Sequence, residues 1–103
     1  MTNSPKPVDL NNHHRDTLMK IFQHPTSHNI EWRTVLSLLE AVGTVEENHD
    51  GKVRAHVGDT IIFLEKPRHK DIDVQQVLDL RHMLQDAGYK AVVEELEDRG
   101  VED

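Results

Sequence analysis

The sequence predicts an α+β fold, a two-layer sandwich in which two helices cover one face of a three-stranded antiparallel sheet. Residues 52–65 alternate between polar and apolar side chains on either side of a Gly-Asp pair, which is typical of a β-hairpin. Residues 30–42 and 74–87 repeat apolar side chains at steps of three and four, which indicates helices with one apolar face. Because a chain of 103 residues forms one small domain, both helices are expected to cover the same sheet.

An extra helix is expected before this core. Residues 1–12 contain two prolines and three asparagines but few apolar residues, so we expect them to be disordered. Residues 15–23 predict a short helix that ends near His24, because Pro25 disfavours helical geometry at the residue before it. The single α+β domain is expected to span residues 13–90.

The first core helix is expected at residues 30–42. Ser27 and Asn29 are both suited to cap its start, and Gly43 is suited to end it. Its apolar stripe consists of Trp32, Val35, Leu36, Leu39 and Val42.

The central hairpin has a predicted register. Gly58 at the first position of a two-residue loop, followed by Asp59, favours a type II′ turn. This turn gives one apolar face, formed by Val53, Ala55, Val57, Thr60, Ile62 and Leu64. The opposite face, called the outer face below, carries Lys52, Arg54, His56, Ile61, Phe63 and Glu65.

A shorter strand, residues 44–48, is expected before the hairpin. A three-residue loop that ends at Gly51 would place Val45 opposite Ala55 on the apolar face and would leave Glu46 outside. A two-residue loop is the alternative, and it would turn Val45 outward. We favour the three-residue loop.

The chain closes with a second helix and an acidic segment. Asp73 is suited to cap the helix at residues 74–87, and Gly88 is suited to end it. Residues 91–103 carry −5 of the formal net charge of −7, so we expect an acidic C-terminal tail with a frayed helix at its start.

Composition narrows the function classes. A net charge of −7 is unlike that of a strongly basic nucleic-acid-binding module. No apolar run reaches membrane-spanning length, and the first residues lack a hydrophobic signal region, so we expect no membrane partner. The absence of cysteine excludes disulfides and thiolate metal sites and suits a reducing cytoplasm, where we expect the protein.

The eight histidines do not follow a metal-binding pattern. Their closest groupings, at residues 13–14 and 24–28, lack the spacing of known metal motifs, so we expect neither a metal nor a cofactor. Two histidines are candidates for acid–base catalysis. His69 lies between two cations, and His56 lies on the outer face.

Two groups of residues are candidates for binding. The candidate RNA contacts are Lys52, Arg54, Lys66, Arg68, His69 and Lys70. A solvated loop is the alternative for the last four. Ile61 and Phe63 predict an interface on the outer face, since exposed apolar patches usually mark one. The outer face has three possible roles: an RNA or protein contact, a seat for the N-terminal helix, or a homodimer interface.

The order of these elements resembles the HicA-type toxins of bacterial toxin–antitoxin pairs over about residues 31–89. The similar parts are the helix WRTVLSLLEAVG, the turn at Gly51, the strand that enters Pro67-Arg68-His69, and the closing helix VLDLRHMLQDAGY. The resemblance implies a double-stranded-RNA-binding-like α-β-β-β-α fold, metal-independent cleavage of mRNA, and an antitoxin-like protein partner.

The sequence departs from this family at the catalytic histidine. HicA-type toxins place that histidine directly after Gly-Ser at the start of the central strand, where this chain has Gly51-Lys52-Val53. Valine cannot exchange a proton, and the predicted register places His56 on the face opposite Val53. We therefore expect a HicA-like protein that binds RNA without robust nuclease activity. A protein-interaction module or homodimer with no nucleic-acid role is the alternative.

Overall fold

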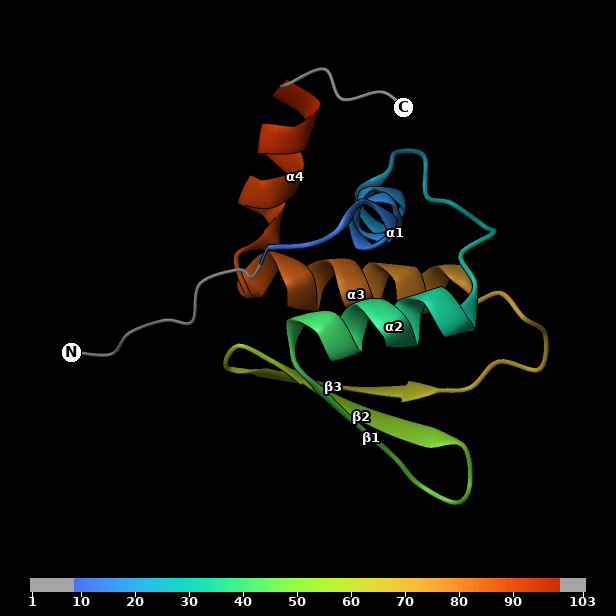
Figure 1. The fold of residues 1–103 in the computed structure, drawn as a ribbon. Helices are drawn as coiled ribbons and strands as arrows, with labels where there is room; N and C mark the ends of the chain where they lie inside the picture. The colour runs from blue at the N-terminus through green and yellow to red at the C-terminus, as the bar shows by residue number, and fades with distance from the viewer. Residues whose placement is uncertain (1–8, 99–103) are drawn as a thin grey trace.

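The computed structural model describes residues 9–98. This part of the chain contains four helices and one three-stranded antiparallel sheet, which confirms the predicted α+β class (Figure 1). No helix in this range is both long enough and apolar enough to cross a bilayer. In chain order the elements are α1 (Asn12–Phe22), α2 (Trp32–Val42), β1 (Thr44–Glu47), β2 (Lys52–Val57), β3 (Thr60–Glu65), α3 (Val74–Asp86) and α4 (Tyr89–Asp98).

The hairpin of β2 and β3 has the predicted register. Val53 lies opposite Leu64, Arg54 opposite Phe63, and the other predicted pairs are also observed. Gly58 has a φ of 60°, while no non-glycine residue has a positive φ among the described residues. This combination is the one that a type II′ turn requires.

β1 pairs with β2 through the three-residue loop that the sequence favours. Val45 lies opposite Ala55, and Glu46 lies opposite Arg54. Gly51 has a φ of 82°, which glycine adopts without strain. The predicted loop is therefore confirmed, and β2 is the central strand of the sheet.

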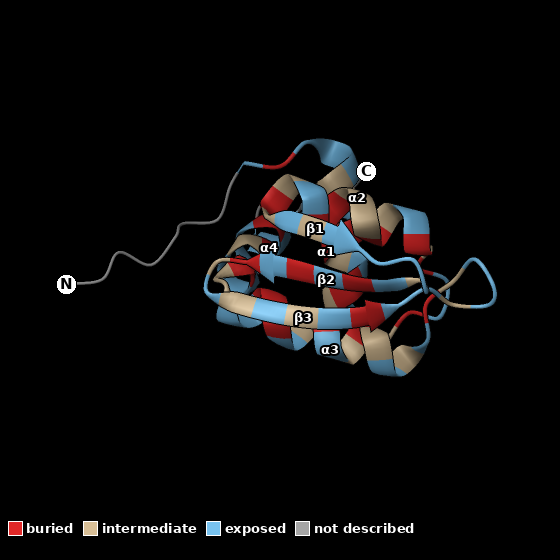
Figure 2. Cartoon of the chain, turned by 90° about the horizontal axis from the view of Figure 1, so that it is seen from below, coloured by how far each residue is buried: buried red, intermediate tan, exposed pale blue. Residues whose placement is uncertain are grey.

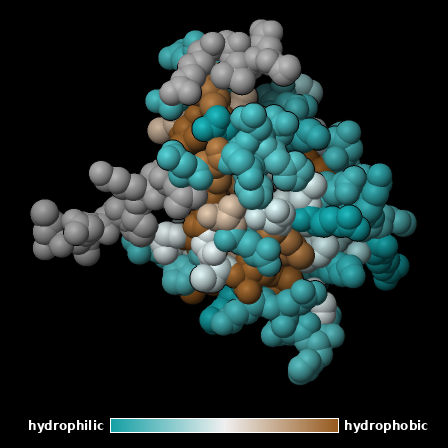
Figure 3. All heavy atoms as spheres, viewed as in Figure 1, coloured by the Kyte–Doolittle hydropathy of each residue, from teal (hydrophilic) through white to brown (hydrophobic). Residues whose placement is uncertain are grey.

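α2 and α3 cover the apolar face of the sheet. α2 packs against β1 and β2, and α3 packs against β3 (Figure 1). The inward residues Val53, Ala55, Val57 and Leu64 are all buried, as the alternating pattern predicts. Seen from the same side as Figure 1, brown hydrophobic residues are visible among teal hydrophilic residues, which cover much of the surface (Figure 3).

α1 and α4 form a second helical layer, which the two-layer prediction did not include. They lie on the side of α2 and α3 that faces away from the sheet (Figure 1). Part of the predicted acidic tail belongs to this layer, because α4 buries Tyr89, Val93 and Leu96. A hydrogen-bond contact of 3.0 Å between His14 Nε2 and Ser37 Oγ links α1 to α2.

The start of α1 corrects the predicted disorder. Leu10 is buried, and the side chain of Asn11 accepts a hydrogen bond of 2.9 Å from the backbone N–H of His14. This cap starts the helix at Asn12, three residues before the predicted start. The rest of the predicted disordered segment, residues 1–8, lies outside the described residues, as do residues 99–103 of the predicted tail.

α2 begins later than predicted, and neither candidate caps it. Ser27 Oγ donates to Asn29 Oδ1 at 2.7 Å, and Glu31 occupies the N-cap position without a capping side-chain hydrogen bond. The backbone of Ile30 instead accepts a hydrogen bond of 2.9 Å from the N–H of Ile72. The start of α3 follows the prediction, since Asp73 accepts from the N–H of Gln76 at 2.8 Å.

Candidate functional site: the outer sheet face and the loop after β3

Within residues 9–98, no helix covers the outer face of the sheet. Figure 2 looks onto this face, with the strands in front of the helices. Phe63 is 75% exposed and Ile61 is 49% exposed, and these are the large apolar residues most open to solvent among those described. α1 packs against the other helices instead of the sheet. The possibility that the N-terminal helix covers this face is therefore wrong.

The alternation of the strands places the residues of this face. Phe63 and Ile61 are two positions apart on β3, so both side chains point to the same side of the sheet. On β2, Arg54 and His56 lie directly opposite these two residues. The apolar patch is thus bordered by polar groups of the central strand.

Charges of both signs share the outer face. Arg54 forms an ion pair of 3.0 Å with Glu46 of β1, and both side chains are largely exposed. Lys52 of β2 lies opposite Glu65 of β3. Two cations are therefore matched by two carboxylates, and the positive charge of this face is neutralised locally.

A groove of about 580 Å³ lies on this face, at the end where the β1–β2 loop meets the exit of β3. Arg54 and Phe63 both line it. The other lining residues are Glu46, Asn48, Lys52, Val53, Leu64 and Glu65.

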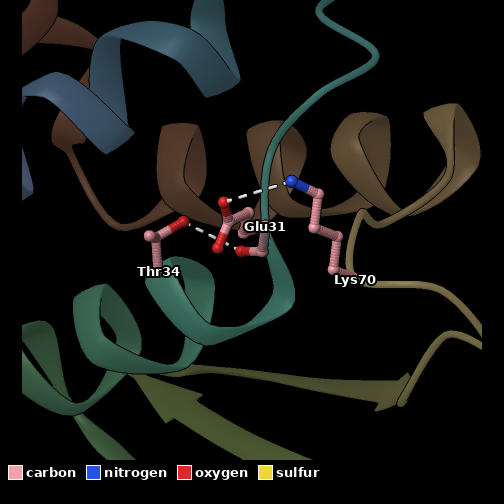
Figure 4. Close-up of polar contacts among 3 residues, drawn as sticks. All are labelled: Glu31, Thr34 and Lys70. Carbon is pink, nitrogen blue, oxygen red and sulfur yellow. Dashed lines mark hydrogen bonds and ion pairs between the residues drawn. The ribbon is translucent and has the colours of Figure 1, made fainter.

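The loop after β3 lines a second groove of about 470 Å³ against the start of α2. The backbone N–H of Trp32 donates to the carbonyl of Lys70 at 2.7 Å, which fixes this loop against the helix. Lys70 Nζ also forms an ion pair of 3.8 Å with Glu31, whose carbonyl accepts a hydrogen bond from Thr34 (Figure 4). The lining residues are Glu31, Trp32, Arg33, Leu36, Glu47, Lys66, His69 and Lys70.

The structure divides the predicted RNA contacts between these two places. Lys52 and Arg54 line the first groove, whereas Lys66, His69 and Lys70 line the second. Arg68 is exposed and lines neither of them. Five of the six residues therefore line two different grooves, and carboxylates line both grooves.

The two catalytic candidates are also separated. His56 is exposed on the outer face, and His69 is exposed in the loop after β3. Val53, where the HicA resemblance would place a histidine, is only 1% exposed and faces the helices. Across residues 9–98, no group of three or more histidine, aspartate or glutamate side chains is arranged to hold a metal ion.

No protein-family model, curated protein or solved structure matches this chain.

Sequence reasoning missed the contribution of α2 to the second groove. Trp32 was assigned to the core, where it is indeed buried, but Arg33 beside it adds a cation to the groove. The missing information is the isolated bridge between Glu31 and Asp71, which brings two segments together across 40 positions of the chain. No local pattern in the sequence signals that bridge.

Proposed function

We propose that this protein is a self-associating interaction module whose outer sheet face binds a second copy of the chain. The observation that carries this proposal is the exposure of Phe63 and Ile61 side by side on an uncovered sheet face. Burying such residues is favourable, at about 25 cal/mol for each Å² of apolar surface removed from water. Exposed apolar patches with a polar border are typical of protein interfaces.

The charge of the face supports a protein partner. Protein surfaces that bind nucleic acids carry an excess of cationic side chains, because neutralising the phosphates provides most of the binding affinity. Here Arg54 is paired with Glu46, and Lys52 lies opposite Glu65. A face with both signs is suited to a second copy of itself, since a two-fold interface brings the same patch of both subunits together.

The edges of the sheet favour association through its face. The N–H of Lys66 donates to the carbonyl of Gly51, so the backbone of Lys66 points toward β2. Backbone groups alternate in direction along a strand, and those of the preceding residue, Glu65, therefore point to the free edge of β3. Gln76 occupies that edge: its amide donates to the Glu65 carbonyl at 3.2 Å and accepts from its N–H at 3.4 Å. The other edge strand, β1, has four residues. Blocked or short edges limit edge-to-edge pairing.

A dilution series followed by NMR tests this proposal. We expect concentration-dependent amide shifts at residues of the outer face, centred on Ile61 and Phe63. The shifts should disappear in Phe63→Ser and persist in Glu40→Ser, a control at an exposed position of α2. Shifts confined to α1 and α4, or none at any concentration, would contradict the proposal.

RNA binding without cleavage is a second candidate function. The order α2, β1, β2, β3, α3 agrees with the α-β-β-β-α order that the HicA resemblance implies. The second groove supports it as well, because Arg33, Lys66 and Lys70 meet there beside His69. Within this interpretation an antitoxin-like protein is the expected partner.

Filter binding with a single-stranded RNA tests this candidate. We expect affinity that falls as salt rises and that falls further in a Lys66→Ala, Lys70→Ala variant. Lys20→Ala, on α1, serves as the matched control. If the RNA is not retained at low salt, this candidate is excluded while the interaction module is unaffected.

A further inference from the structure

The groove on the outer face lies beside the most exposed apolar side chain. Phe63 and its cross-strand partner Arg54 both line the groove of about 580 Å³. Sites of about 300 to 1,000 Å³ are large enough for a drug-sized molecule, so this one can admit a phenyl ring. Phe63 remains 75% exposed despite its neighbour, which means that its own Arg54 does not cover it.

Arg54 is held in a geometry that suits an aromatic ring. Glu46 Oε1 lies 3.0 Å from the Arg54 Nη2 atom, so the carboxylate pairs with one terminal nitrogen of the guanidinium. A planar guanidinium that is paired through one nitrogen can still offer its flat face for stacking on an aromatic side chain. On the outer face, that ring is Phe63.

We propose that Phe63 of each subunit enters the groove of the other subunit and stacks on its Arg54. This inference rests on the proposed self-association and specifies its geometry. A two-fold axis that passes between Phe63 and Arg54 generates the contact twice, because Phe63 of each subunit then meets Arg54 of the other. The Glu46 carboxylates keep the two buried guanidinium groups paired.

Mixing two complementary variants tests this crossed contact. Phe63→Ala and Arg54→Ala homodimers each lose both contacts, whereas the mixed dimer retains the Phe63 of one chain and the Arg54 of the other. We expect the mixed dimer to be tighter than either homodimer by roughly two- to fivefold, the range that an exposed cation–π contact provides. Native mass spectrometry of unequally labelled chains measures the three dimers in one sample.

His56→Ala provides the matched control. His56 is exposed on the same face but does not line the groove. Mixed with Phe63→Ala, it should give a dimer whose stability lies between those of the two homodimers. Thermal unfolding by circular dichroism checks that each variant folds, as expected for substitutions of exposed side chains.

Disulfide trapping gives a second readout. The chain has no cysteine, so introduced cysteines have no competing partner. A mixture of Phe63→Cys and Arg54→Cys should cross-link faster than either variant alone, because the bond forms only where the two backbones come close.

The outcomes separate the two claims. A wild-type protein that stays monomeric overturns both the interaction module and its geometry. If the wild-type protein dimerises but the mixed dimer of Phe63→Ala and Arg54→Ala is no tighter than either homodimer, the crossed contact alone is overturned. Association that is lost in Phe63→Ala and unchanged in Arg54→Ala would also overturn it, since the two phenyl rings would then meet each other.

Discussion

At the scale of single residues, Val53 lies at the position where the HicA resemblance would place a catalytic histidine. Val53 is buried under the helices, opposite Leu64. A histidine there would bring a polar ring into the core, away from the outer face. An unsatisfied buried donor costs about 1–3 kcal/mol.

Val53→His is therefore expected to destabilise the protein by that amount without creating nuclease activity. Urea unfolding measures the first effect and an mRNA degradation assay measures the second. Arg54→His, one position along on the exposed face, is the control and should leave stability nearly unchanged. A stable Val53→His variant that cleaves mRNA would contradict the assignment of this position to the core.

Gly43 is the second residue with a decisive position. It ends α2 with a φ of −167°, an extended conformation, so the need for glycine is not conformational. A Cβ atom at this position would lie 2.0 Å from the carbonyl oxygen of His56 on β2. Glycine allows the end of the helix to approach the strand closely.

Gly43→Ala should therefore lower the free energy of unfolding by roughly 1–3 kcal/mol, as overpacking typically does. Thr44→Ala, at the exposed next position, is the control. Chemical denaturation of both variants makes the comparison. Equal stability of Gly43→Ala and the wild type would show that the strand and the helix end can move apart at little cost.

At the scale of elements, Arg81 of α3 joins the two helical layers. Its guanidinium donates to the carbonyls of Ile21 and Gln23 at 2.9 and 3.1 Å, and it lies 3.4 Å from Thr26 Oγ1. These carbonyls belong to the last turn of α1 and its C-cap, where a cation also interacts favourably with the helix dipole. Arg81 therefore holds the end of α1 on α3.

Arg81→Met keeps most of the aliphatic stem and removes these hydrogen bonds. We expect a loss of about 1.5–3 kcal/mol in unfolding free energy, the usual contribution of hydrogen bonds to a charged group. Hydrogen exchange should accelerate first in α1. Exchange that accelerates uniformly over all helices would contradict a local role of Arg81 at the end of α1. Arg33→Met, at an exposed position of α2, is the control.

Some elements of the fold can be predicted from local sequence patterns, and others cannot. The hairpin register follows from alternation and one turn glycine, so every predicted pair of β2 and β3 could be derived locally. The second helical layer could not, because local patterns predict a helix before the core and a frayed helix after it but do not show that both pack on α2 and α3. The start of α2 depends on the bridge between Glu31 and Asp71, which joins distant segments.

The candidate site divides in the same way. The outer position of Ile61 and Phe63 follows from the register alone, and the structure places both there. The separation of the basic residues into two grooves does not, since it depends on how the loop after β3 folds back onto α2.

At the scale of the whole molecule, the helices within residues 9–98 leave one face of the sheet without cover. Four helices lie in two layers on one side of the sheet, and the other side exposes an apolar pair among balanced charges (Figures 1 and 2). An open antiparallel sheet is stable with one solvated face, but that face is then usually polar. The exposed Phe63 departs from this pattern, and this departure is the reason for the proposed self-association.

Sedimentation equilibrium of the wild-type protein, from low micromolar to near-millimolar concentration, tests this central claim most directly. The account predicts an apparent mass that rises from 11.9 kDa toward twice that value as concentration increases. In Phe63→Ser the rise should be lost, while Glu40→Ser should behave as the wild type does. A mass of 11.9 kDa for the wild-type protein at every concentration would contradict the account.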